Sequence, residues 1–369
     1  MQLAFLNPLF EHPGPWASVY VDLSRPGSTP ARRSLEADAV LKSLVAQEAD
    51  EPTVRAVDGA LRELRDSREP VGRALFAAQG EIVLDRPLTV PPGGTRALWG
   101  TLPHVAPLLE LADDDPVCLV AAVDRRGADL ELRGSRGTEP AGRVTTRQPA
   151  VPGTDTASED SEPPAPVSAE YSWEQNAELI AEAVTARQER SGAELVVLVG
   201  DERVRRAVHD RLPRHLLPRT VESGHGGRSA GSATRLLDDD VERARQAHVR
   251  GRTEGELERF AAARATDGER AGAAEGVPAL VEAAREHRIA ELLVRPAGPD
   301  AHRTVWIGRA PDQLATRRTD TRFLGEPEPA PARADDALLR AAAATGAAAL
   351  AVRSERTPEG GLGALLRWS

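Results

Sequence analysis

The amino-acid sequence predicts a mixed α/β fold divided among three domains. Helical patterns alternate with short β-rich runs along the chain, which is typical of layered α/β domains. The chain has 369 residues, more than one ordinary domain uses. An acidic break at "ADDDP" (112–116) and a new helix–strand repeat after residue 268 divide it. We therefore predict domains at residues 1–112, 113–268 and 269–369.

The first domain begins with a strand followed by two helices. "ASVYVDLS" (17–24) is β-rich, and in the second helix apolar residues from Val54 to Leu64 recur at spacings of three, four and three. That spacing places one stripe of the helix against a core. "GRALFAA" and "EIVLDRPL" predict a pair of strands joined around Gln79-Gly80.

The middle domain begins with "VCLVAAVDRRGADLELRG" (117–134), which predicts two strands joined by a turn. Residues 148–170 carry five Pro, five acidic residues and no basic residue, so we expect a mobile loop there. A helix is predicted at 173–190, and the continuous apolar run "ELVVLVG" (194–200) predicts a strand covered on both faces. A short helix, a strand near "RTVE" and a long charged helix at about 237–265 complete this domain.

The third domain repeats one pattern twice. "EGVPALVEAAREHRIAELLVRP" (275–296) predicts a helix and then a buried strand, and "ADDALLRAAAATGAAALAV" (334–352) predicts the same order. "GGLGALLRW" (360–368) predicts a closing strand entered through a Gly-Gly turn. The repeat predicts a small layered α/β domain.

Composition excludes several classes of protein. The formal net charge is −10, which argues against a generally basic nucleic-acid coat protein. The single cysteine, Cys118, lies in an apolar run and predicts a buried thiol. No apolar run approaches the ~20 residues that span a bilayer, and the N-terminus lacks the basic start of a signal peptide. These features predict a soluble, cytoplasmic protein without a cofactor, a membrane partner or a DNA partner.

The stretch "ESGHGGRSAG" (222–231) allows several interpretations. It contains the G-x-S-x-G spelling of a hydrolase nucleophile elbow around Ser229. However, at least five residues separate Ser229 from the strand before it, and helix signals resume only near Leu236. An elbow needs a sharp turn directly between strand and helix. No Lys-Ser or Lys-Thr follows the glycines, so a phosphate-binding P-loop is excluded as well.

A zinc site made by His209, His215 and His225 lacks both cysteines and a helical i, i+4 histidine pair. We therefore predict no catalytic residue and no metal site in this region. A glycine-rich loop is the plain interpretation of the stretch.

Charge placement is more informative than these motifs. Residues 203–252 contain twelve Arg and six acidic residues, a net +6 in a chain of −10. One interpretation is a solvated helix face with Arg–Glu pairs. The other is a surface that contacts phosphate, with Arg side chains beside a loop where Gly226 and Gly227 let backbone N–H groups approach the ligand.

The order of several segments resembles a known family. The segments are "PWASVYVDLS", "PHVAPLLELADDDPVCLVAAVDRRGADLEL", "ELVVLVGDERVRRAV", "GVPALVEAAREHRIAELLV" and "GGLGALLRW". Together they resemble the archaeo-eukaryotic class-one release factors and Pelota, and more closely their actinobacterial relatives. Those relatives include mycobacterial dormancy-linked proteins and Balon-type ribosome hibernation factors.

The resemblance implies an N-terminal domain that enters the decoding site and a middle domain with an RNase H-like sheet. It also implies a C-terminal αβα domain that resembles kink-turn-binding ribosomal proteins and docks a translation GTPase, such as elongation factor Tu, or another partner. Release factors carry a Gly-Gly-Gln motif where this chain has residues 148–170, and that segment lacks the motif. Gln148 and Gln175 flank it, but neither has adjacent glycines.

The primary hypothesis is a non-hydrolytic hibernation or rescue factor that binds the ribosomal A site through rRNA phosphates. Two alternatives remain: a peptidyl-tRNA hydrolase of ribosome quality control, and a stress-linked binding protein that acts away from the ribosome. For RNA contact we predict seven residues: Arg203, Arg205, Arg206, Gly226, Gly227, Arg228 and Arg235.

Overall fold

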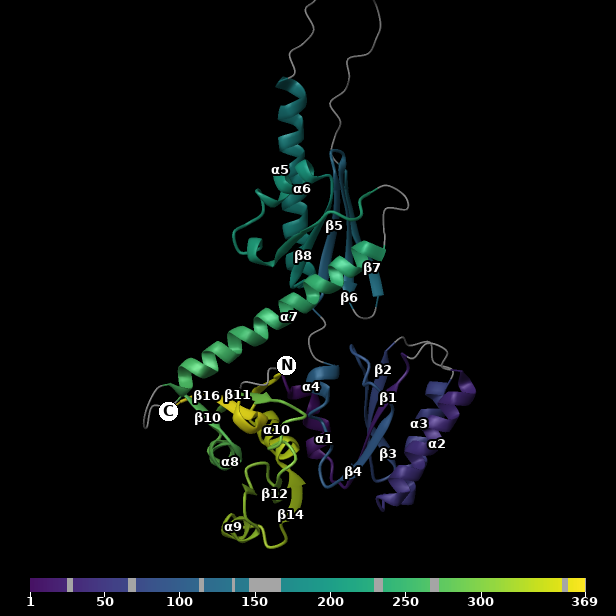
Figure 1. Ribbon diagram of the computed structural model, residues 1–369, viewed down its shortest axis with the longest axis vertical. Helices are drawn as coiled ribbons and strands as arrows, with labels where there is room; N and C mark the ends of the chain where they lie inside the picture. The colour runs from purple at the N-terminus through teal and green to yellow at the C-terminus, as the bar shows by residue number, and fades with distance from the viewer. Residues whose placement is uncertain are drawn as a thin grey trace, which may run out of the picture. The chain divides into compact units, whose positions relative to one another are not determined.

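The chain forms two compact units (Figure 1). Unit 1 comprises residues 1–114 and 253–369, and unit 2 comprises residues 115–252. Helix α7 (Arg235–Arg264) contributes residues to both units. The computed structural model describes residues 1–24, 29–65, 71–112, 116–134, 137–145, 167–228, 235–265, 272–353 and 358–368.

Unit 2 is built on a mixed five-stranded sheet in the order β7-β6-β5-β8-β9. Its strands are β5 (Cys118–Asp124), β6 (Gly127–Gly134), β7 (Gly137–Thr145), β8 (Leu195–Gly200) and β9 (Thr220–Ser223). Strands β5, β6 and β7 pair antiparallel, whereas β8 pairs parallel with both β5 and β9. Parallel neighbours need a crossover, which α5 (Val167–Ser191) and α6 (Glu202–His209) provide.

Both faces of this sheet are covered, as the apolar run of β8 predicted. Val196 and Leu198 pack in a cluster with α5 and α6, while Val197 and Val199 pack in another with α7. Cys118 lies in the second cluster and is fully buried. Burial raises the pKa of its thiol to about 12, so the thiol stays protonated near neutral pH.

The N-terminal part of unit 1 is an antiparallel sheet in the order β3-β2-β1-β4. One face packs on α2 and α3, and the apolar stripe predicted between Val54 and Leu64 faces that core. Gln79 and Gly80 both have positive φ and join β2 to β3 as a tight hairpin turn. The elements are η1 (Ala4–Leu6), α1 (Asn7–Glu11), β1 (Trp16–Asp22), α2 (Pro30–Ala46), α3 (Glu51–Arg65), β2 (Gly72–Ala78), β3 (Glu81–Pro87), β4 (Arg96–Gly100) and α4 (Leu108–Leu111).

The C-terminal part of unit 1 holds a second four-stranded sheet, β10-β16-β11-β15. Helices α8 and α10 pack on one face, and Phe260 near the end of α7 packs on the other, which gives three αβα layers. Both predicted helix–strand repeats are confirmed. The elements of these layers are β10 (Ala273–Glu275), α8 (Val277–Arg285), β11 (Ile289–Val294), α10 (Ala334–Ala344), β15 (Ala348–Ala351) and β16 (Leu362–Leu366).

A small sheet in the order β13-β12-β14 lies between β11 and α10 in sequence. The sequence patterns did not predict it. Its elements are β12 (Thr304–Ile307), β13 (Leu314–Ala315), α9 (Arg318–Phe323) and β14 (Ala330–Arg333).

The predicted fold class, a mixed α/β chain of several sheets, is confirmed, and one boundary differs from the predictions. Residues 167–170, expected in the loop, begin helix α5, while residues 148–166 lie outside the described residues. The segments predicted as the first and third domains share one compact unit and one hydrophobic cluster. The three-domain division and the RNase H-like and kink-turn-protein-like labels stay predictions. None of the described helices is long and apolar enough to cross a membrane.

Candidate nucleic-acid interface

Residues 203–219 of unit 2, called the basic segment below, carry six arginines and one acidic residue. The segment comprises most of α6, the turn after it and the 3-10 helix η2 (Leu217–Arg219). One stripe of the segment is packed into the unit, and every arginine of the segment except Arg205 is exposed. The buried stripe residues follow one another at intervals of four: Val204, Val208, Leu212 and Leu216.

Arg211 is exposed and donates to the Ala207 carbonyl at 3.0 Å. The other four exposed guanidinium groups of the basic segment have no ion-pair or hydrogen-bond partner among the described residues. They belong to Arg203, Arg206, Arg214 and Arg219. Arg235, the first residue of α7, is exposed and equally without a described carboxylate partner. A guanidinium group offers a planar fork of five N–H donors that matches phosphate oxygens. This surface can therefore bind the backbone of a nucleic acid.

Arg205 has a different environment from the other arginines predicted to contact RNA. Its side chain is only 11% exposed. It donates to the carbonyl oxygens of Gly200 and Ser223 and lies 3.4 Å from the Glu222 carboxylate. The guanidinium group thus joins the end of β8 to β9, and it is engaged within the protein.

Arg228, the loop arginine predicted to face RNA, is also engaged within unit 2. Its Nη1 lies 2.7 Å from Asp124 and its Nε 3.2 Å from Asp129, and its side chain is 16% exposed. Although burial raises the pKa of Asp129, hydrogen bonds from Arg143 and Arg228 hold it below its usual range. Arg228 therefore fixes the glycine loop to the β5–β6 hairpin. In this loop Gly226 has φ +93°, a conformation that favours glycine.

A histidine, a serine and an aspartate meet beside the glycine loop, but they do not form a hydrolytic triad. Asp240 accepts from Ser223 Oγ at 2.5 Å, and His225 Nδ1 lies 2.8 Å from the same oxygen. These two hydrogen bonds lower the pKa of Asp240. In a triad the serine hydroxyl bonds the histidine, which then activates it. Here the serine donates directly to the carboxylate, so the group anchors the loop; Ser229 lies outside the described residues.

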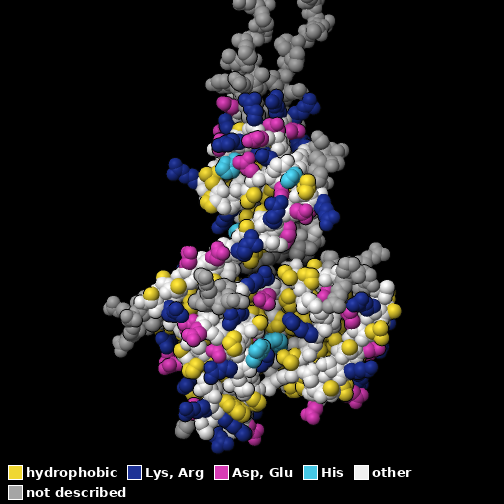
Figure 2. Space-filling model, in the orientation of Figure 1, with side chains coloured by type: hydrophobic (Ala, Val, Ile, Leu, Met, Phe, Trp, Pro, Cys, Tyr) yellow, Lys and Arg dark blue, Asp and Glu magenta, His cyan; other side chains and the backbone are white. Residues whose placement is uncertain are grey.

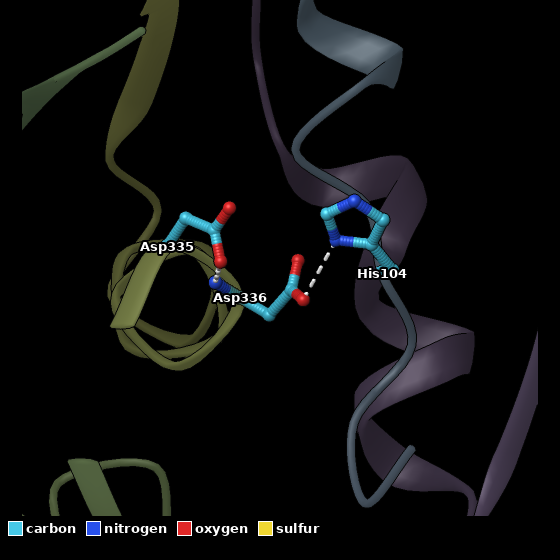
Figure 3. A group of neighbouring side chains, drawn as sticks. All are labelled: His104, Asp335 and Asp336. Atoms are coloured by element: carbon cyan, nitrogen blue, oxygen red, sulfur yellow. Dashed lines mark hydrogen bonds and ion pairs between the residues drawn. The ribbon is translucent and has the colours of Figure 1, made fainter. Parts of the chain in front are cut away.

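A second polar cluster lies in unit 1, at the first turn of α10 (Figure 3). Asp335 and Asp336 are buried, with side-chain exposures of 0% and 2%. Asp336 lies 2.9 Å from His104 Nδ1 and accepts from the backbone N–H groups of Val105 and Ala106. Arg333 pairs with Asp335 at 2.6 Å. The cluster therefore joins the N-terminal part of unit 1 to its C-terminal part.

Among the described residues, His104, Asp335 and Asp336 form the one group close enough to share a metal ion. The acceptor oxygens of Asp336 already receive N–H donors, and Asp335 is bound to Arg333. These contacts fit a hydrogen-bonded cluster that joins two parts of the fold, called the staple below, better than a metal site. The staple consists of His104, Asp335 and Asp336 with Arg333. Burial, and then the neighbouring Asp336 carboxylate, raise the pKa of Asp335 to about 6 against the opposing effect of Arg333.

Sequence reasoning named Arg203, Arg206 and Arg235 but missed Arg214 and Arg219, which share their exposed, unpaired state. The interval of four between the buried apolar residues could have identified Arg214, because it lies midway between Leu212 and Leu216 and so on the solvent side. Arg219 follows the last of these buried residues. The staple of unit 1 had no such signal. Its partners lie 232 positions apart in the chain.

Comparison with known proteins identifies a family and a relative that this chain resembles. Residues 117–266 match the model of "Bacterial archaeo-eukaryotic release factor family 2". Over 364 residues the chain is 28% identical to the uncharacterized protein Rv2629 of Mycobacterium tuberculosis, covering 96% of this chain and 94% of that protein. Residues 117–266 of this chain thus belong to bacterial archaeo-eukaryotic release factor family 2.

Solved structures of Pelota and Dom34 resemble this chain at low sequence identity. Archaeal Pelota, from a model of ribosome-bound Pelota and ABCE1, is 15% identical with a TM-score of 0.42, over 99% of this chain and 94% of that one. Dom34 of S. cerevisiae is 11% identical with a TM-score of 0.40, over 81% of this chain and 74% of that one. These scores are low, so the fold assignment rests on the strand order of the chain itself.

Replacing Arg228 by methionine is expected to loosen the glycine loop without weakening RNA binding. The change removes both ion pairs, whose carboxylate partners are partly exposed, so we expect a loss of about 1 kcal/mol in the unfolding free energy of unit 2. Amide hydrogen exchange at residues 224–227 should accelerate. Ribosome affinity falling with the loop intact would instead assign Arg228 to RNA contact.

Proposed function

We propose that this chain is a ribosome-associated translation factor that binds the A site without hydrolysing peptidyl-tRNA, as a hibernation or rescue factor. The observation that carries the proposal is the basic segment, in which five exposed arginines lack a carboxylate partner among the described residues. This segment lies inside the residues that match the release-factor family model. The surface fits the phosphate backbone of ribosomal RNA.

The charge distribution explains how an acidic protein can bind RNA. The chain has a net charge of −10, yet the basic segment holds six arginines against one acidic residue. Within a Debye length of ~10 Å or less, a ligand responds to local charge more than to the total. Phosphates bound by these arginines release counterions, so affinity should fall as salt rises. Net negative charge elsewhere disfavours non-specific binding to other nucleic acids.

The residues present support a role without hydrolysis. Residues 148–166 lie outside the described residues, and their sequence contains no Gly-Gly-Gln. Gln175 stands exposed on helix α5 between Glu174 and Asn176, without the glycines that allow close backbone approach. Ser223, His225 and Asp240 are engaged as an anchor. We further propose that the C-terminal αβα layers dock a translation GTPase such as elongation factor Tu, as the family resemblance implies.

Charge reversal in the basic segment is the direct test. The variant Arg206→Glu/Arg214→Glu should co-sediment with vacant 70S ribosomes ~100-fold more weakly than the unmodified chain at about 100 mM salt. The salt dependence of binding should also become shallower. For a duplex, each lost phosphate contact reduces the steepness of a plot of log affinity against log salt concentration by about 0.9. Both side chains are exposed, so the fold should be unaffected.

The matched control is Arg126→Glu/Arg190→Glu, which makes the same change of charge at exposed positions of unit 2 outside the basic segment. It should retain most of the affinity. If both variants weakened ribosome binding equally, total charge would explain the effect, and the basic segment would not be the RNA-binding surface. Absence of any ribosome binding would favour a role away from the ribosome, and cleavage of peptidyl-tRNA by the purified chain would favour the hydrolase.

A further inference from the structure

The small sheet of unit 1 presents a tryptophan on its outer face. Along β12 the side chains alternate, with Val305 and Ile307 buried at 0% and 5% exposure and Thr304 exposed. Trp306 lies on the same face as Thr304 and is partly exposed. Figure 1 shows this sheet and α9 at the end of unit 1. A partly exposed indole ring on a regular strand offers a fixed apolar surface to a ligand.

An arginine lies over this ring. The guanidinium carbon of Arg318, the first residue of α9, is 5.4 Å from the centroid of Trp306. Gln313 donates to the carbonyl of Leu324 at 3.0 Å, which ties the end of α9 to the start of β13. Strand β12, which carries the ring, is paired on both sides by β13 and β14. The backbones that carry the ring and the guanidinium group are thus fixed before any ligand binds, which reduces the entropy cost of binding.

Three more arginines of this subdomain are exposed and have no carboxylate partner among the described residues: Arg309, Arg317 and Arg322. Three of the nearby acidic groups have other partners, and one of them, Asp320, accepts from the Thr319 hydroxyl at 3.1 Å. Asp312 lies 3.8 Å from His287, and the buried Glu326 accepts from the backbone N–H groups of Arg309 and Glu328. In Figure 2, Lys and Arg side chains gather over the end of unit 1 that holds α9.

The loop that carries Arg309 is equally well anchored. Arg340, which is buried on α10, donates to the carbonyl oxygens of Gly308 and Arg309. The Gln313 side chain accepts from the Ala310 N–H at 2.9 Å. Arg309 therefore projects from a backbone that is fixed on both sides.

We propose that Trp306, Arg318, Arg309, Arg317 and Arg322 form a second RNA-binding surface, here called the Arg–Trp surface, which takes single-stranded RNA. The unpaired arginines bind successive phosphates, and an unstacked base packs on the Trp306–Arg318 pair. Single unpaired arginines are ordinary on protein surfaces. Their combination with an exposed ring distinguishes RNA from an acidic protein, because bases stack on aromatic rings and on guanidinium planes.

The Arg–Trp surface differs in chemistry from the basic segment and does not depend on the function proposed above. Residues 203–219 contain no aromatic side chain, so that segment binds phosphates alone. The Arg–Trp surface adds a stacking platform and should therefore prefer unpaired nucleotides. This preference can be tested with small RNAs in the absence of ribosomes.

The test uses the full chain carrying Arg203→Glu/Arg206→Glu/Arg214→Glu, so that the basic segment no longer binds. A fluorescein-labelled oligouridylate of about 12 nucleotides is titrated by fluorescence anisotropy at low salt. In this background Arg317→Glu/Arg322→Glu should raise the Kd by ~10-fold or more, with a shallower salt slope. Trp306→Leu, which keeps an apolar group on the strand, should raise the Kd ~5- to 100-fold through lost stacking.

The charge-matched control, Arg285→Glu/Arg353→Glu, reverses two exposed arginines elsewhere in unit 1 and should leave the Kd nearly unchanged. Equal weakening by this control would overturn the proposal, as would an unchanged Kd for Trp306→Leu with its fold intact by circular dichroism. A duplex RNA bound as tightly as oligouridylate would overturn the preference for single strands. Displacement of the RNA by polyglutamate at equal charge would assign the surface to an acidic protein. Failure of ribosome binding alone would leave these small-RNA results standing.

Discussion

The Asp336→Ala variant is expected to lower the unfolding free energy of unit 1 by roughly 3–5 kcal/mol. Asp336 is 2% exposed and accepts from two backbone N–H groups, those of Val105 at 3.0 Å and Ala106 at 3.4 Å. It also holds His104 at 2.9 Å. Alanine leaves these donors without an acceptor in a buried place, at a cost of ~1–3 kcal/mol for each unsatisfied group. Thermal or urea unfolding of the full chain measures the loss.

Two comparison variants make this expectation specific. Asp336→Asn keeps an acceptor oxygen for the backbone donors, so it should cost less than alanine. Asp38→Ala removes an exposed aspartate from helix α2 and should be nearly neutral. Equal stabilities for Asp336→Ala and Asp38→Ala would show that the staple does not hold the two parts of unit 1 together. Because the chain has two units, their transitions should be followed separately.

Gly200→Ala is expected to destabilise unit 2 by about 3–5 kcal/mol. Gly200 ends β8 with φ +130°, immediately before Asp201, whose side chain caps helix α6. A Cβ at this position would lie 2.1 Å from the carbonyl oxygen of Val123 on the neighbouring strand. The backbone must move to relieve this overlap, and the movement would displace the start of the basic segment. Denaturant unfolding reports the stability, and ribosome co-sedimentation reports the displacement.

Gly192→Ala is the matched control for this prediction. Gly192 also has positive φ, +67°, but a Cβ there would meet no atom within 4 Å. It should therefore cost only the ~1–2 kcal/mol of the left-handed conformation. The difference between the two variants reports the steric overlap at Gly200 together with the added cost of its φ of +130°. Similar losses in both variants would mean that conformation alone explains the glycine at position 200.

Most of the secondary structure was predictable because its signals are local. The run "ELVVLVG" predicted a strand buried on both faces, and β8 is that strand. The small sheet of unit 1 was not predicted, because its local signals are too weak. Its strands have two to four residues, too short for a period to be read. Without a predicted strand, the sequence could not indicate that Trp306 faces outward.

The candidate interface was predictable as a region but not residue by residue. The excess of arginine between residues 203 and 252 marked the place. However, Arg206 is exposed and unpaired among the described residues, whereas Arg228 is bound to Asp124 and Asp129, about a hundred positions earlier in the chain. Charge counting treats the two arginines alike, because it does not see partners that folding brings together.

The sequence by itself determined which face of α6 is buried. Val204 and Val208 lie four positions apart, and a helical backbone places such residues on one buried face, with Arg206 on the other. Only the tertiary structure decided which guanidinium groups stay available for a ligand, and that His104 would meet Asp336. Periodicity depends on neighbouring residues along the chain, whereas ion pairs depend on distances across space that only the packed sheets and helices set.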